Sequence, residues 1–144
     1  MPLVTHFEEL RVYKTAFEAA MVIFRLSKSW PPEERYSLTD QIRRSSRSAC
    51  GQIAEGWKKR RYPNHFISKL TDSDGEVAET ENWLRFALEC EYMTRDNFDL
   101  LREKYRTVSA GLADMITHAD SWCGPATHIR EEPAEYNVNR EDEL

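Results

Sequence analysis

Apolar residues recur three and four positions apart along four successive segments of this 144-residue chain. That spacing places them on one face of an α-helix, and no segment has the alternation that is typical of a β-strand. The predicted helices span residues 6–30, 34–61, 64–92 and 95–122. Short polar or proline-containing stretches separate them, so successive helices can lie antiparallel. The sequence therefore predicts an all-α fold, an up-and-down four-helix bundle that occupies residues 1–123.

The same spacing predicts which residues are buried and where the helices start. Thr5 with Glu8 is predicted to form a capping box, and Ser37 and Thr94 are predicted N-caps. The predicted core stripes are Phe7, Leu10, Tyr13, Phe17, Ala20 and Phe24; Leu38, Ile42, Ser45, Ala49, Ile53 and Gly56; Phe66, Leu70, Ser73, Val77, Thr80, Leu84 and Ala87; and Phe98, Leu101, Tyr105, Val108, Leu112, Met115, Ala119 and Trp122. The remaining residues, 124–144, are rich in glutamate, and we expect a flexible acidic tail.

The second predicted helix has a cationic face opposite its packing face. Residues 35–61 carry eight basic side chains against two acidic ones, although the whole chain has a net charge of −5. An acidic protein can bind polyanions when its positive charge gathers on one face. We call the basic residues of this face the cationic ridge: Arg43, Arg44, Arg47, Lys58, Lys59, Arg60 and Arg61.

Three interpretations of the cationic ridge remain open at this stage: a solvated helix face, an interface with acidic residues of another subunit, and a phosphate-binding surface. Arginine favours the last, because guanidinium groups make forked contacts to phosphate. Trp57 and Tyr62 flank the basic run and are candidates for stacking on bases. The favoured hypothesis is nucleic-acid binding, preferentially RNA. The alternative is an oligomeric scaffold that docks a protein partner, with the ridge in intersubunit salt bridges to Glu76, Glu79 and Glu81.

The sequence offers little for catalysis or metal binding. There is no Glu-x-x-His pair for a di-iron centre, no glycine-rich phosphate loop, and no histidine and carboxylate placed locally to activate a serine. Cys50, Cys90 and Cys123 form no Cys-x-x-Cys pair, which is typical of small buried residues in a reducing compartment. We therefore expect no enzyme activity, catalytic residue, metal or cofactor. No apolar run reaches the roughly 20 residues of a membrane span, so we expect a cytoplasmic protein without a membrane partner.

Two motifs resemble those of a known family. Residues 41–45 (QIRRS) and 53–56 (IAEG), with the aromatic–proline break at Trp30 and Pro31, resemble the four-helix bundle proteins encoded in 23S ribosomal RNA intervening sequences. The resemblance spans about residues 7–122. One departure is residues 48–52 (SACGQ), where family members often have a proline, so we expect a straighter second helix.

The resemblance implies a ring-like homopentamer. A related branch, the accessory protein of diversity-generating retroelements, is thought to bind nucleic acid and a reverse transcriptase. By this resemblance Arg43 and Arg44 contribute to a cationic surface, and Glu55 is a structural or interface carboxylate. Glu76 and Glu79 lie in a further matching stretch and are assigned the same kind of role. The expected partners are further copies of the chain, RNA or DNA, and, in the scaffold alternative, another protein.

Overall fold

The computed structural model describes residues 3–123, and within that range it contains helices and no β-strand. The predicted all-α class is confirmed. The predicted acidic tail, residues 124–144, lies outside the described residues. Four long helices account for most of the fold: α1 (Arg11–Ser27), α2 (Asp40–Lys58), α3 (Pro63–Glu89) and α4 (Arg95–Thr117). The short elements are the 3-10 helices η1 (Phe7–Glu9) and η2 (Pro32–Glu34), the π-helical turn η3 (Arg35–Thr39) and the final helix α5 (Ala119–Trp122).

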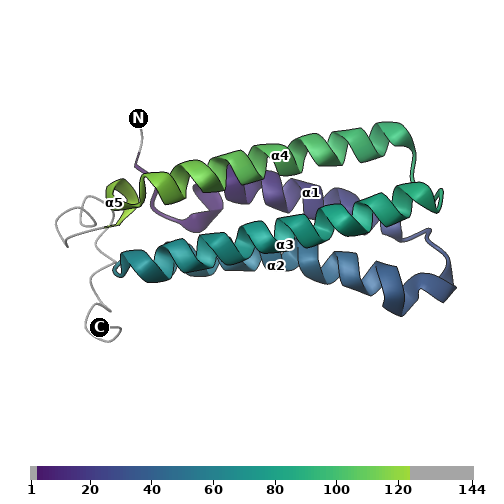
Figure 1. The fold of residues 1–144 in the computed structure, drawn as a ribbon, viewed down its shortest axis with the longest axis horizontal. Coiled ribbons are helices and arrows are strands. Elements are labelled where there is room, and N and C mark those ends of the chain that lie inside the picture. Colours follow the sequence, from purple (N-terminus) through teal and green to yellow (C-terminus); the bar gives the residue numbers. More distant parts are fainter. Residues whose placement is uncertain (1–2, 124–144) are drawn as a thin grey trace.

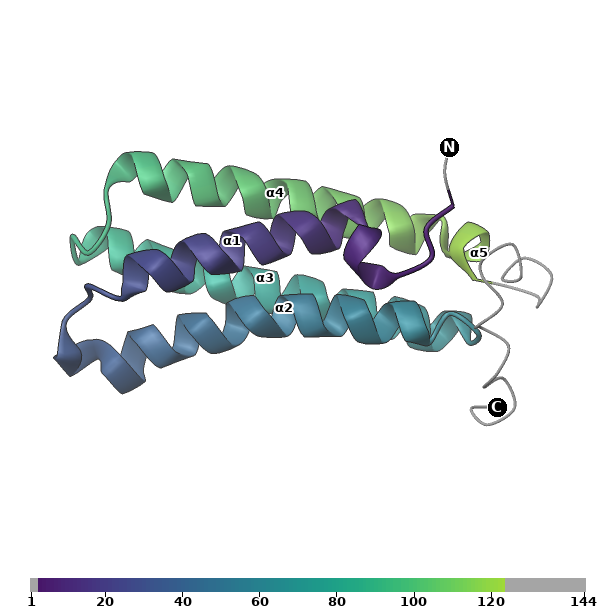
Figure 2. The same ribbon diagram turned by 180° about the vertical axis from the view of Figure 1, so that it is seen from behind.

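The four long helices lie side by side, and each runs opposite to the one before it (Figure 1). α1 packs against α2 and α4, and α3 packs against the same two helices, so the four surround one core. The view from behind shows α1 and α2 as neighbours along their lengths (Figure 2). The α2–α3 turn and α5 lie at one end, and the other two interhelical turns lie at the opposite end (Figure 1).

The helix starts differ from the prediction at two places and agree at one. Thr5 N donates to Glu9 Oε1 at 2.8 Å, so the predicted capping box with Glu8 is wrong. Leu10 is extended, and the α-helix begins after it, at Arg11. Ser37 does not cap a helix but lies within η3. The Thr94 cap is confirmed, because its Oγ1 accepts from Asn97 N at 3.1 Å.

The predicted core stripe of the first helix is wrong in part. Phe17 is 48% exposed, and Tyr13 and Phe24 are only half-buried. The core face of α1 is instead made mostly of small or branched residues: Val12, Ala16, Ala19, Ala20, Ile23 and Ser27. Small side chains let α1 approach its neighbours closely, so the aromatic rings lie on the flank of the helix. The predicted stripes of α3 and α4 are buried at every position within those helices.

Close packing between α2 and α3 also depends on small residues. Ser73 Oγ donates to the Ala49 carbonyl at 2.8 Å, which joins the two helices through a buried hydrogen bond. A Cβ added at Gly56 would lie 3.2 Å from Leu70 Cδ2, tighter than ordinary van der Waals contact. The predicted packing face of α2 is thereby confirmed at Ser45, Ala49 and Gly56, which are all buried.

Candidate functional site

The first half of the cationic ridge surrounds an open depression on the surface of α2. Three arginines line it together with Asp40 and Ser48: Arg43, Arg44 and Arg47. These arginines lie within about one turn of one helix, which explains why the sequence alone could bring them together. The guanidinium groups of such arginines can present forked donors to an anion.

An aromatic ring of α1 supports two of these arginines. The guanidinium carbons of Arg43 and Arg47 lie 5.0 and 5.7 Å from the centroid of the Phe24 ring, and Lys28 Nζ lies 4.9 Å from it. Arg43 Nε also donates to Ser27 Oγ at 2.9 Å. The negative face of an aromatic ring attracts cations, so Phe24 gathers three positive groups on the α1–α2 side of the protein. Phe24, Ser27 and Lys28 were not predicted to be parts of this site.

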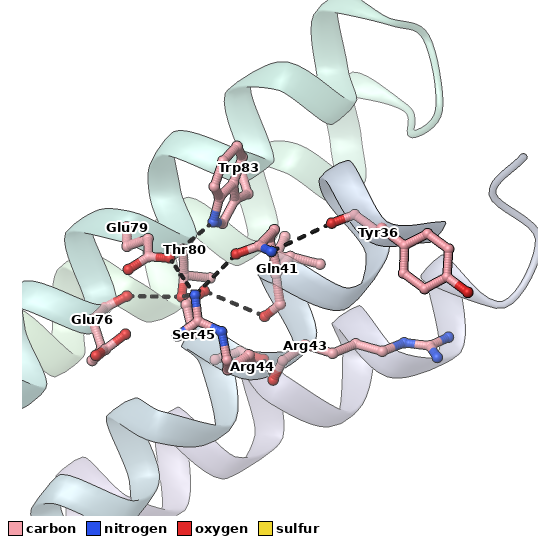
Figure 3. Close-up of polar contacts among 11 residues, drawn as sticks. Tyr36, Gln41, Arg43, Arg44, Ser45, Glu76, Glu79, Thr80 and Trp83 are labelled. Atoms are coloured by element: carbon pink, nitrogen blue, oxygen red, sulfur yellow. Dashed lines mark hydrogen bonds and ion pairs between the residues drawn. The ribbon is translucent and has the colours of Figure 1, made fainter. Parts of the chain in front are cut away.

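Arg44 points toward α3, whereas Arg43 extends away from it (Figure 3). Arg44 Nη2 donates to Gln41 Oε1 at 2.9 Å and lies 3.4 Å from Glu79 Oε2. Trp83 Nε1 donates to that same Glu79 oxygen at 3.3 Å. At the other end, Gln41 Nε2 donates to the Tyr36 carbonyl at 3.3 Å (Figure 3). Arg44 is therefore held in place by a polar network within its own chain.

Helix α2 ends within the second half of the ridge, and the ridge residues near this end differ in exposure. Lys58 and Lys59 are exposed, but Arg60 is only 4% exposed. Arg60 Nε donates to the Trp57 carbonyl at 2.8 Å, and its guanidinium carbon lies 3.5 Å from the centroid of the Trp57 ring. Because α2 ends at Lys58, the chain turns and directs Arg60 back over the tryptophan. The assignment of Arg60 to the binding surface is wrong.

The proposed stacking role of Trp57 is also wrong. Its side chain is 4% exposed and packs edge-on against Trp122, with the ring centroids 6.2 Å apart. A buried ring cannot offer a face to a base. Tyr62 and Arg61 are half-buried, and each has an interaction partner, so their roles remain predictions.

Two of the three carboxylates assigned to structural roles, Glu55 and Glu79, pair with cations of their own chain. Glu55 Oε1 lies 2.8 Å from Lys69 Nζ, and this ion pair links α2 to α3. The hydrogen bond to Glu55 raises the pKa of Lys69. Glu79 holds Arg44, as described above. Glu76 is half-buried, and its Oε1 atom has no hydrogen-bond partner among residues 3–123.

Several ridge cations lack a carboxylate partner. Arg43, Arg47, Lys58 and Lys59 have no carboxylate oxygen within 4.0 Å among the residues that the structure describes. On α3 and α4 every lysine and arginine except Arg102 pairs with a carboxylate; the paired cations are Lys69, Arg85, Arg95, Lys104 and Arg106. Other cations within residues 3–123 also lack a carboxylate partner, and they lie mostly on α1: Arg11, Lys14, Arg25, Lys28, Arg35 and Arg102.

Metal ligands, apolar helices and thiols are further features of the described part of the chain that bear on function. Within residues 3–123, no three His, Cys, Asp or Glu side chains are placed to hold a metal ion, and no helix is long and apolar enough to cross a bilayer. Burial raises the pKa of Cys50 and of Cys123 to about 11, so neither thiol ionises readily near neutral pH.

Comparisons with known proteins point to one family. The family model for 23S rRNA-intervening sequence proteins matches residues 8–114. Among solved structures, the chain is similar to a protein of unknown function from the S23 ribosomal protein family of Bacteroides thetaiotaomicron. The identity is 27% and the TM-score 0.65, over 74% of this chain and 95% of the other. No curated protein matches the chain.

Proposed function

The chain belongs to the 23S rRNA-intervening sequence protein family, and we propose that it is a non-enzymatic nucleic-acid-binding protein of the cytoplasm, with a preference for RNA. The observation that carries this proposal is the depression lined by Arg43, Arg44 and Arg47. Two of these arginines have no carboxylate partner within residues 3–123, so their charge is available to a phosphate group. Phosphate contacts of this kind depend on charge and shape rather than on base sequence.

We further propose that the subunit is a four-helix bundle that assembles into a ring-like homopentamer, as the family resemblance implies. Five weak cationic surfaces in one assembly would bind a long polyanion far more tightly than one surface alone. Leu100 on α4 is about half exposed, and a contact between subunits is one use for such an apolar side chain.

The alternative function is an oligomeric scaffold whose ridge contacts the acidic α3 of a neighbouring subunit. Exposed Asp72 on α3 favours it, because this carboxylate has no ion-pair partner within residues 3–123. Glu79 argues against it, since this carboxylate already accepts from Arg44 of its own chain. The scaffold is therefore the second candidate.

The test is a titration of fluorescent single-stranded RNA, structured RNA and duplex DNA with the purified protein, at several salt concentrations. The test variant changes three exposed ridge cations, Arg47→Glu, Lys58→Glu and Lys59→Glu. The matched control, Arg85→Glu, Arg95→Glu and Arg106→Glu, alters the net charge equally but on α3 and α4.

We expect the affinity of the native protein to fall log-linearly with salt, because binding releases counterions from the nucleic acid. The ridge variant should bind at least about tenfold more weakly than the control variant at low salt, since it loses three phosphate contacts. Equal binding by the two variants, or no binding by the native protein at low salt, would contradict the proposal. Loss of the oligomer in the ridge variant alone would favour the scaffold.

A further inference from the structure

Four rings form a continuous aromatic row that leads from the N-terminal turn onto α1. Successive ring centroids lie 4.4 Å apart for His6 and Phe7, 5.0 Å for Phe7 and Tyr13, and 6.0 Å for Tyr13 and Phe17. Phe17 ends the row and is 48% exposed, although the sequence predicted it to be in the core. A large exposed ring that is held from behind by another ring is a rigid apolar surface.

The aromatic row borders the cationic ridge. Arg43 and Arg47 contact Phe24, so the flank of α1 that carries Phe24 faces α2. Phe17 precedes Phe24 by seven residues, which is close to two helical turns, so both rings lie on that flank. Burial and the nearby Cys50 thiol of α2 raise the pKa of Tyr13, in agreement with this placement.

On the α2 side, the surface between the two cationic ends of the ridge is open. Gly51 is exposed, and a Cβ added to it would meet no atom within 4 Å. It lies on the same helix face as Arg47 and Lys58. At 1.5 Å per residue, these two cations are about 16 Å apart along the helix axis. The α1–α2 side therefore has positive charge at both ends and an exposed ring beside a surface without bulky side chains.

We propose that this side binds single-stranded RNA, with phosphates at Arg47 and Lys58 and an unpaired base stacked on Phe17. This inference rests on the proposed function and specifies the form of the ligand. Bases of a duplex are stacked inside the helix, whereas a single strand can place a base on an aromatic side chain. The anionic strand complements the unpaired ridge cations, and every base has a face that can stack, so binding tolerates different sequences.

The experiment compares Phe17→Ala with Phe86→Ala, which removes an equally exposed phenylalanine from α3 (53% against 48% exposure). Each variant is titrated with a fluorescein-labelled ten-nucleotide oligoadenylate, with an abasic strand of the same length, and with an RNA duplex. Circular dichroism and the mass of the oligomer in solution are measured for both variants. Phe17→Trp tests whether another aromatic ring restores binding.

We expect Phe17→Ala to weaken oligoadenylate binding by about 5-fold to 150-fold, the range for loss of one stacked base. Its binding of the abasic strand and the duplex should change less than about twofold, since their phosphate contacts remain. Phe86→Ala should bind all three probes like the native protein, and Phe17→Trp should bind oligoadenylate normally.

Three outcomes would overturn the inference. Unchanged oligoadenylate binding by Phe17→Ala, with the ridge still required, would remove base stacking but leave the proposed function intact. Equal affinities of the native protein for the abasic strand and for oligoadenylate would also remove base stacking and leave the proposed function intact. A changed oligomer mass in Phe17→Ala would show that Phe17 lies between subunits. Absence of binding to every probe at low salt would instead reject the proposed function itself.

Discussion

Ser45 of α2 and Thr80 of α3 share a hydrogen bond in the centre of the protein, with 2.7 Å between Oγ and Oγ1 and no exposure of either side chain. Each hydroxyl also has a backbone acceptor: the Glu76 carbonyl lies 2.8 Å from Thr80 Oγ1, and the Ile42 carbonyl lies 3.4 Å from Ser45 Oγ. The shorter backbone contact favours Thr80 as its donor, which leaves the Ser45 hydrogen for the bond between the helices. Both hydroxyls are thus satisfied inside an otherwise apolar core. Their hydrogen bond links α2, which carries the ridge arginines, to α3.

We expect Ser45→Ala and Thr80→Val each to lower the free energy of unfolding by about 1 kcal/mol, the usual contribution of one hydrogen bond. The double variant should lose less than the sum, because the second substitution removes a partner that is already gone. Urea denaturation of the four proteins, followed by circular dichroism, measures this coupling. Strict additivity would contradict the assigned hydrogen bond.

Gly111 lies where α4 approaches α1 closely. A Cβ at this position would lie 2.5 Å from Val12 Cγ1, and a β-branched side chain has little freedom to move away. We expect Gly111→Ala to destabilise the fold by about 1–3 kcal/mol, as overpacking does. Adding Val12→Ala should recover part of that loss, since it removes the clashing methyl group.

Gly51→Ala is the matched control for Gly111→Ala. Its added Cβ meets nothing within 4 Å, and the position is exposed in the interior of α2. It should stabilise the protein by about 0.5–1 kcal/mol through the lower backbone entropy of alanine in the unfolded chain. Chemical denaturation measures both substitutions. Destabilisation by both would contradict the difference in packing.

Stability at low pH should depend on the contact between Tyr92 and Glu34. Tyr92 Oη donates to Glu34 Oε2 at 2.7 Å, and this bond lowers the pKa of Glu34. A carboxylate with a lowered pKa stabilises the fold above its ordinary pKa, and that contribution is lost as the pH falls through the lowered value. Tyr92→Phe should therefore reduce the loss of stability between pH 7 and pH 3.

The same contact should also matter at high pH. The hydrogen bond to Glu34 raises the pKa of Tyr92 to about 12. The stabilising effect of the neutral phenol is complete below its ordinary pKa of 10.0 and is lost as the pH rises toward 12. Thermal unfolding at a series of pH values tests both the low-pH and the high-pH effect. Tyr36→Phe is the control, because Tyr36 is 72% exposed. Identical pH profiles for Tyr92→Phe and the native protein would count against this contact.

The three cysteines should differ in reactivity. Cys90 is exposed, whereas Cys50 is 7% exposed and Cys123 is fully buried. We expect a maleimide to label Cys90 alone in the folded protein, and all three thiols in urea, because thiolates react only where the reagent reaches them. Intact-mass and peptide mass spectrometry give the sites. Rapid labelling of Cys50 in the folded state would show that α1 and α2 separate.

Much of the fold follows from periodicity, and the exceptions have physical reasons. Phe98, Leu101 and Tyr105 are buried as predicted, because an uninterrupted three–four spacing leaves one possible core face. Two apolar faces are available on α1, and spacing alone does not decide between them. The buried face is the one with Ala16 and Ala19, because small side chains let helices approach closely. The aromatic face therefore lies at the surface.

The candidate site was predictable only where its residues share one helix. Arg43 and Arg47 are one turn apart, so their common face follows from the sequence. Phe24 lies next to them because α1 packs against α2. The periodicity of a single helix does not predict such a contact between two helices. Trp57 and Arg60 were misassigned because the run of basic residues continues past the end of α2, where the chain turns and buries Arg60 against the tryptophan.

The network around Arg44 has a consequence for ligand binding. A free arginine side chain gives up roughly 2 kcal/mol of rotational entropy when it becomes fixed. Gln41 and Glu79 already hold Arg44, so folding has removed much of that freedom before any ligand arrives. In the proposed site, Arg44 would offer a phosphate an oriented donor that is shared with Glu79, whereas Arg47, which contacts the Phe24 ring, would be ordered further by the ligand. Binding of the proposed phosphate at Arg44 would then cost less side-chain entropy than binding at Arg47.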